Sequence, residues 1–356
     1  MEKTFTYQTG FNLGHWFACN HKLLKKYNLT AEQHWNNYIT EADFARMAEW
    51  GADHVRLPVD YPAFVPDSEP EVFIESTLAY FDRAIAWGKK YGLGVVMDLH
   101  HAPGHWIYTP WNENDLLTNP EHQAKFIRIW EFFTRRYLAE GDNLRFDLLN
   151  ELNCVATEPW NELWQETVAH IRQIDSNRKI YIGGNAANSV YHLKKLALID
   201  DPNVLYTFHM YEPLLFTHQK TGANQARLDW TRDRVIPWPY NYDDHLGYYQ
   251  MPQPGGQTPV GPGTVFDKEF LRKPILEAVK FREETGREIW MGEYGVVWFA
   301  DDDSTVRYLN DVADLCIEYG IGRAVYSYRG FARITDPDPI HFSVHDMRMV
   351  EAVTRK

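Results

Sequence analysis

Short runs of apolar residues alternate with helical patterns along most of the chain, and this alternation strongly limits the possible folds. Eight runs are typical of buried strands, because each is short and mostly free of charge. They occupy residues 10–14, 54–58, 94–99, 144–149, 180–183, 204–208, 288–292 and 323–327. Eight strands that alternate with helices predict an α/β fold, a closed parallel (β/α)8 TIM barrel.

The segments between these runs carry apolar residues at helical spacing. In the first segment, Thr40 and Asp43 form a capping signature, and Gly51 suits the position after the last turn. Phe44 and Met47 then share one face of the helix. Further helices are expected at 76–91, 121–138, 160–174, 268–284, 304–319 and 343–355, with a weaker pattern at 189–199.

The main alternative to a barrel is a doubly wound open sheet. That fold is favoured by a glycine-rich GxGxxG turn after the first strand, and residues 10–16 (GFNLGHW) lack this turn. A length of 356 residues suits one barrel. We therefore expect a single catalytic domain over residues 1–356.

One long segment interrupts the alternation. Residues 212–267, between the sixth strand and the next helix, are rich in proline, glycine, tryptophan and tyrosine and show no clear periodicity. Loops of this length in compact domains are often functional lids. The segment is expected to be an inserted loop or subdomain over the active-site cleft. The alternative is a packed insertion without a role.

The charge balance narrows the possible partners. The chain has 49 acidic and 36 basic residues, a net charge of −13, which argues against nucleic acid, an anionic membrane surface or a polyanionic substrate. Its 13 tryptophans and 21 tyrosines fit either a large aromatic core or a protein that stacks aromatic rings on sugars.

The cysteines and the apolar content of the sequence say little about disulfide bonds or targeting. Cys19, Cys154 and Cys316 are odd in number and form no CxxC pair, so neither a disulfide framework nor a zinc ribbon is expected. The chain has no run of 18 apolar residues and no apolar signal segment near its start. We expect a cytoplasmic protein, or a secreted one if a signal was removed. The oligomeric state stays open.

Polar residues gather where the predicted strands end. In a TIM barrel such residues face the active site at the carboxyl ends of the strands. Any one of them could serve only structure, but inert strand ends would rarely collect so many. The set comprises Arg56, Asp98, His100, His101, Asn150, Glu151, His209, Tyr211, Glu212, Glu293, Tyr326 and Tyr328.

Two of these residues are glutamates that end separate strands. Glu151 follows RFDLLN, and Glu293 follows EIWMG. Glycoside hydrolysis uses such a pair, in which one carboxyl holds a proton and the other stays ionised. Arg56 is expected to keep Glu293 ionised and Tyr211 to orient it, while Asn150 binds a sugar 2-hydroxyl. A salt bridge is the ordinary alternative for a lone glutamate.

The histidines also suggest a metal site. His100, His101 and His105 lie close in sequence, and His209 follows another strand. Adjacent strand residues point apart, and the chain has no HExxH helix, so we expect no metal and no cofactor. Hydrogen bonds to sugar hydroxyls are the favoured role. A serine triad is disfavoured because no GxSxG turn exists.

Several motifs together carry a family resemblance. They are DHVRLP (53–58), MDLHHAPG (97–104), LLNEL (148–152), IDSNRKIYIGGN (174–185), FHMYEP (208–213), FTHQ (216–219) and MGEYG (291–295). On these residues the chain resembles glycoside hydrolase family 5, the cellulases, and within it endoglucanase C-type enzymes. The resemblance covers nearly the whole chain.

The resemblance implies a retaining double displacement on β-linked glucan, with Glu151 as acid/base and Glu293 as nucleophile. It places residues 212–267 in a small subdomain over the cleft. It also implies a functional set at matching positions, to which His101 is added as part of the same wall. This set comprises Arg56, His100, Asn150, His209 and Tyr211.

The chain departs from the family pattern at two places. Tyr326 stands where the family usually has a tryptophan platform under the sugar, and residues 13–16 read LGHW where relatives often read LGGW. We expect Tyr326, His15 and Trp16 to contribute to substrate binding. Both departures affect which sugar the site would accept, and neither changes the two glutamates.

The favoured function is that of a retaining, endo-β-1,4-glucanase-like glycoside hydrolase whose partner is a β-linked oligo- or polysaccharide. An exo-acting β-glucosidase or β-mannosidase is the alternative within this class. A carbohydrate-binding barrel without catalysis and a metal-dependent hydrolase are the alternatives from other classes.

Overall fold

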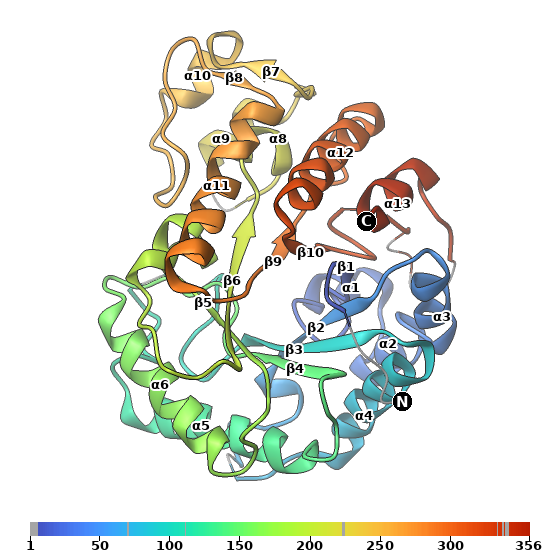
Figure 1. The fold of residues 1–356 in the computed structure, drawn as a ribbon. Helices are drawn as coiled ribbons and strands as arrows, with labels where there is room; N and C mark the ends of the chain where they lie inside the picture. The colour runs from blue at the N-terminus through green and yellow to red at the C-terminus, as the bar shows by residue number, and fades with distance from the viewer. Residues whose placement is uncertain are drawn as a thin grey trace.

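The computed structural model describes residues 6–69, 71–110, 112–222, 225–332, 334–336, 338 and 342–356. Its centre is a closed barrel of eight parallel strands in the order β1-β2-β3-β4-β5-β6-β9-β10, which confirms the predicted barrel (Figure 1). The strands are β1 Thr9–Asn12, β2 His54–Asp60, β3 Gly94–His101, β4 Leu144–Asp147, β5 Ile180–Gly183, β6 Val204–Met210, β9 Ile289–Tyr294 and β10 Gly322–Val325.

Helices surround the barrel, and each buries an apolar stripe. In α4, the predicted residues Leu78, Phe81 and Ile85 are buried. Helix α3 begins at the predicted capping signature, because the Thr40 backbone N–H donates to Asp43 Oδ2 (2.8 Å). The main helices are α3 Glu41–Glu49, α4 Glu75–Tyr91, α5 Pro120–Arg136, α6 Glu158–Arg172, α11 Lys268–Thr285, α12 Asp302–Tyr319 and α13 Met347–Thr354.

The weak helical pattern at 189–199 is only partly helical. It forms the 3-10 helix η2 Val190–Lys195, which follows the short turn α7 Asn185–Asn188. Ser189 opens η2 by accepting a hydrogen bond from the Tyr191 backbone N–H (3.3 Å). The helix ends at Lys195, and the extended backbone at Leu196 starts the connection that leads to β6.

The β1 loop contains two helices that the sequence pattern did not predict, α1 His21–Tyr27 and α2 Ala31–Asn37. Thr30 and Gln33 form a complete capping box at the start of α2. The described residues contain no helix that is both long and apolar enough to cross a membrane.

The long insertion is a folded lobe rather than an irregular loop. Figure 1 shows it as a yellow and pale-orange region beyond β6 and beside α11. Trp238, Tyr240, Tyr248 and Phe266 form its buried aromatic centre, which explains the aromatic content of the segment. Its elements are α8 Leu214–Thr217, α9 Gln225–Thr231, β7 Tyr240–Asn241, η3 Tyr242–His245, α10 Leu246–Tyr249 and β8 Val265–Phe266.

Candidate active site

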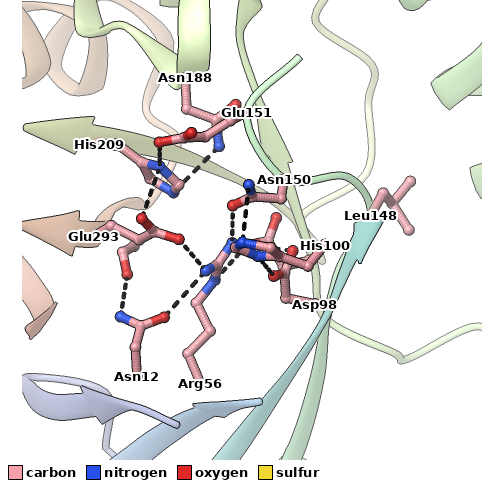
Figure 2. Close-up of polar contacts among 12 residues, drawn as sticks. Asn12, Arg56, Asp98, His100, Leu148, Asn150, Glu151, Asn188, His209 and Glu293 are labelled. Carbon is pink, nitrogen blue, oxygen red and sulfur yellow. Dashed lines mark hydrogen bonds and ion pairs between the residues drawn. The ribbon is translucent and has the colours of Figure 1, made fainter. Parts of the chain in front are cut away.

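The two predicted glutamates meet at the carboxyl ends of the barrel strands (Figure 2). Glu293 lies inside β9 and is 3% exposed. Glu151 follows β4 with a left-handed φ of 43°. A carboxylate oxygen of each glutamate and one ring nitrogen of His209 all lie within 4.8 Å of one another. This separation lets the two carboxyl groups act on opposite sides of one bond.

Arg56 lies below Glu293 at the centre of a buried polar network (Figure 2). One guanidinium nitrogen donates to Glu293 Oε1 at 2.5 Å. Three further N–H groups donate to side chains that surround the arginine, and the guanidinium also forms an ion pair with Asp98. The acceptors are Asn12 Oδ1 (3.1 Å), Asp147 Oδ2 (2.9 Å) and Asn150 Oδ1 (3.0 Å), and the ion pair joins Nη2 to Asp98 Oδ1 (3.0 Å).

Acidic groups outnumber basic groups in this network. Three carboxyl groups share one guanidinium, and burial raises the pKa of Asp98 and of Asp147 to about 7. Arg56 remains protonated, because its three acidic neighbours raise its pKa despite complete burial. Its short contact with Glu293 therefore places a permanent positive charge beside that carboxylate.

Two further side chains fix the orientation of the glutamates. The Tyr211 hydroxyl donates to Glu293 Oε2 (2.7 Å), in the arrangement that the sequence predicted. His209 Nδ1 lies 2.9 Å from Glu151 Oε1 and 3.6 Å from Glu293 Oε2. Burial lowers the pKa of His209 to about 3, so the ring is neutral. The Asn188 amide lies 3.3 Å from Nε2, which leaves Nδ1–H to donate to Glu151.

A second histidine chain holds Asn150. His100 Nδ1 donates to Asp98 Oδ2 (2.8 Å), so its Nε2 carries a lone pair and faces the Asn150 amide nitrogen (3.5 Å). The Asn150 carbonyl oxygen accepts from Arg56. Asn150 is thus held from both ends, which suits a residue that must present its amide to a substrate hydroxyl.

Glu151 differs from Glu293 in its surroundings. None of the arginines that the structure describes pairs with it, and burial raises its pKa to about 6. A carboxyl with this pKa stays protonated in a larger share of molecules near neutral pH than an ordinary glutamate. The arrangement therefore offers a proton donor at Glu151 and, at Glu293, a carboxyl group that lies beside the positive charge of Arg56.

This pKa predicts an alkaline limb in the pH profile. As pH rises through about 6, Glu151 loses its proton, so kcat/KM should fall about tenfold per pH unit once the acid is ionised. The measurement is kcat/KM for an oligosaccharide from pH 4 to 9. In Glu151→Gln this limb should disappear from the profile of the residual activity on the same oligosaccharide. Persistence of the limb in that variant would assign it to another group.

Comparison with known proteins identifies the family. The model of the cellulase family, glycosyl hydrolase family 5, matches residues 17–331. The chain belongs to glycoside hydrolase family 5. It is therefore a glycosidase, and the matched residues cover most of the barrel described above.

Several family 5 relatives align over most of the chain. Endoglucanase C of Acetivibrio thermocellus is 37% identical over 91% of this chain and 92% of its own length. Cellodextrinase A of Ruminococcus flavefaciens is 30% identical over 88% and 83%. A solved structure of Thermotoga maritima Cel5A with mannotriose has a TM-score of 0.75, 22% identity and coverage of 98% and 97%. The chain is thus an endoglucanase-like glycoside hydrolase.

Three predicted site residues lie around this family 5 centre without touching the glutamates. Tyr326 stacks on His100, with ring centroids 6.2 Å apart and planes 10° from parallel. His15 meets Tyr326 edge-on at 6.3 Å. His101 points away from His100 and stacks on Trp106 (5.1 Å), as expected for neighbours on one strand.

Trp16 is a correction to the predicted site. It is 1% exposed, stacks on Phe17 (4.2 Å), and its Nε1–H donates to the Trp35 carbonyl (2.9 Å). These contacts belong to the core between the barrel and its helices. The backbone turns at His15, which has a left-handed φ of 65°, and this turn sends the two neighbouring side chains in different directions.

The structure adds three residues that the predicted set lacked, Asn12, Asp147 and Asn188, and it pairs the strand-end residue Asp98 with Arg56. Asp98 had been noted at a strand end, and Asp147 is a charged residue inside a run expected to be buried. Both signals indicate a partner for Arg56. Asn188 follows β5 in a left-handed backbone conformation, and no sequence motif pointed to it.

The positions of the potential metal ligands are relevant to the alternative hypothesis of a metal-dependent hydrolase. The potential ligands that converge are Glu151, His209 and Glu293 rather than the predicted histidine cluster. The oxygens of Glu293 already accept from Arg56 and Tyr211. A cation at this point would lie beside the Arg56 guanidinium, so like-charge repulsion disfavours it.

A cleft of about 560 Å³ adjoins the site. Tyr108 and Trp298 on its walls are 63% and 48% exposed, as suits aromatic platforms for sugar rings. Thr221 of the inserted lobe also lines it. The cleft reaches the catalytic centre through Phe331, whose ring contacts that of Tyr211 (5.9 Å).

Proposed function

We propose that this chain is a retaining endo-β-1,4-glucanase in which Glu293 is the nucleophile and Glu151 the acid/base. The observation that carries the proposal is the pair itself. The two carboxylates have oxygens within 4.8 Å, one is bound to Arg56, and the other has a pKa raised to about 6. Retaining glycosidases hold their carboxyl groups about 5–5.5 Å apart, whereas inverting enzymes need more than about 6.5 Å.

In the first step, a carboxylate oxygen of Glu293 attacks the anomeric carbon and the glycosidic C–O bond breaks. Glu151 gives its proton to the departing oxygen, so the leaving sugar departs as a neutral alcohol. Arg56 and Tyr211 donate to the two oxygens of Glu293 and so hold its orientation before the attack. The product is a covalent glycosyl–enzyme ester.

In the second step, Glu151 is ionised and acts as a base. It takes a proton from water, the water oxygen attacks the anomeric carbon, and the ester bond to Glu293 breaks. His209 donates to Glu151 throughout, because its own low pKa keeps it neutral and unable to take the proton. Two inversions at one carbon leave the configuration unchanged.

The substrate assignment rests on the relatives and the cleft. The aligned relatives include an endoglucanase and a cellodextrinase, and the cleft carries exposed aromatic rings. We place β-1,4-linked glucan or its oligosaccharides first. The alternative is an exo-acting β-glucosidase or β-mannosidase, and the likeness in fold to a protein solved with mannotriose keeps mannan in the test panel.

A product profile tests this function. Purified protein is incubated with cello-, manno-, laminari- and mixed-linkage oligosaccharides, with Glu293→Gln as the inactive control. Endo action should release several cello-oligosaccharide lengths from the first minutes. Release of one terminal sugar from the start would instead support the exo-acting alternative, and cleavage of mannan alone would reject the glucan assignment.

A further inference from the structure

The imidazole ring of His15 lies in a space beside Gly330 that a larger residue there would fill. Its φ of 65° is left-handed, a conformation that non-glycine residues seldom adopt. Its carbonyl accepts from His34 Nε2 (2.6 Å), which holds the turn. Gly330 also has a positive φ of 99°, and a Cβ there would lie 2.5 Å from His15 Cδ2. The imidazole therefore fits only because residue 330 is glycine.

The hydrogen bonds of His15 fix which ring nitrogen can bind a ligand. Its Nδ1 lies 3.1 Å from the carbonyl oxygen of Cys19, and a carbonyl can only accept, so Nδ1 carries the proton. Burial lowers the pKa of His15 to about 4, so the ring is neutral near pH 7. Its Nε2 then has a lone pair, because the hydrogen bond that the ring forms with the described residues uses Nδ1, and the His15 side chain lines the cleft.

The position of His15 in the barrel indicates which sugar of the substrate its ring faces. The ring meets Tyr326 edge-on, and the Tyr326 ring packs so closely on Gly14 that a Cβ there would lie 2.8 Å from it. His15 follows β1 and Tyr326 follows β10, next to each other in the barrel, whereas the proton donor Glu151 follows β4 on the other side. The leaving sugar lies toward Glu151, so His15 faces the sugar that becomes bound to Glu293.

We propose that His15 is a specificity-determining residue, whose Nε2 accepts a hydrogen bond from a free hydroxyl of the sugar on the glycone side of the cleavage point. This inference rests on the proposed function. An acceptor held at the cleft wall favours a glycone sugar with an unsubstituted hydroxyl there. A sugar that lacks this hydroxyl, or carries an ether or ester on it, leaves the acceptor without a partner.

The test compares hydroxyl requirements in wild type and two variants. The probes are 4-nitrophenyl β-cellobioside and analogues that lack the 2-, 3- or 6-hydroxyl of the sugar attached to nitrophenol. His15→Phe keeps a ring against Gly330 and removes the acceptor. His15→Asn keeps a polar group and tolerates the left-handed backbone.

In wild type, one deoxy analogue should lose about 3- to 10-fold in kcat/KM through the missing bond to His15. His15→Phe should lose a similar factor on the parent substrate and show no further loss on that analogue, with partial recovery in His15→Asn. The proposal would be overturned if His15→Phe lowered kcat/KM by the same factor on every probe, or if it lowered kcat/KM on none of them. If wild type cleaves none of the probes and no oligosaccharide, the proposed function itself fails, which separates the two outcomes.

Discussion

Replacing Glu293 with glutamine should lower kcat by a factor of at least about 10² to 10⁴, the range typical of losing one catalytic carboxyl group. Glutamine keeps the size of the side chain, and its amide oxygen can still accept from Arg56. It has no carboxylate to attack the anomeric carbon, so the covalent ester cannot form. The measurement is initial-rate kinetics on cello-oligosaccharides, with thermal unfolding to verify that the variant is folded.

Glu288→Gln is the matched control, because Glu288 directly precedes β9 and its partially exposed side chain pairs with Arg145 (3.1 Å) away from the site. It should keep nearly full activity. Glu151→Gln offers a contrast, since it should be slow on oligosaccharides and less impaired on aryl glycosides that need no proton for departure. A folded Glu293→Gln protein with wild-type turnover would reject the nucleophile assignment.

Replacing Arg56 with methionine should cost about 3–5 kcal/mol of unfolding free energy, besides abolishing activity. The side chain is fully buried and neutralises Asp98, Asp147 and Glu293. Methionine has a similar volume but leaves these carboxyl groups without a positive partner. Denaturant unfolding of wild type and variant measures the difference.

Arg348→Met provides the surface comparison for this experiment. Arg348 pairs with Asp303 and Asp346, but its side chain is 55% exposed, so water screens the charges. Its loss should leave the unfolding midpoint close to that of the wild type. Equal unfolding midpoints for Arg56→Met and Arg348→Met would show that the buried network does not stabilise the barrel.

The parts of the fold that could be predicted are those with strong periodicity. Strands buried on both faces are continuous apolar runs, and the stripe of Leu78, Phe81 and Ile85 indicates one buried helix face. The polar residue that ends each run then falls at the carboxyl end of the barrel. This is why Glu151 and Glu293 could be paired across 142 positions of sequence, from 151 to 293.

The features that were missed depend on tertiary contacts. The segment 212–267 was predicted as an insertion, but its elements were not, because they are only two to seven residues long and pack through aromatic rings such as Trp238 and Tyr240. Trp16 adjoins His15 in sequence, and only the left-handed turn between β1 and α1 decides which of the two faces the cleft. Asn188 was missed because its role depends on His209, 21 residues away.

The most direct test of the proposed mechanism is the configuration of the first product. Proton NMR can follow the anomeric signals during the first minutes of cello-oligosaccharide hydrolysis, before mutarotation mixes the anomers. A double displacement at Glu293 and Glu151 predicts that the new reducing end appears first as the β-anomer. An α-anomer that forms first would mean inversion, and it would contradict the assignment of Glu293 as a nucleophile.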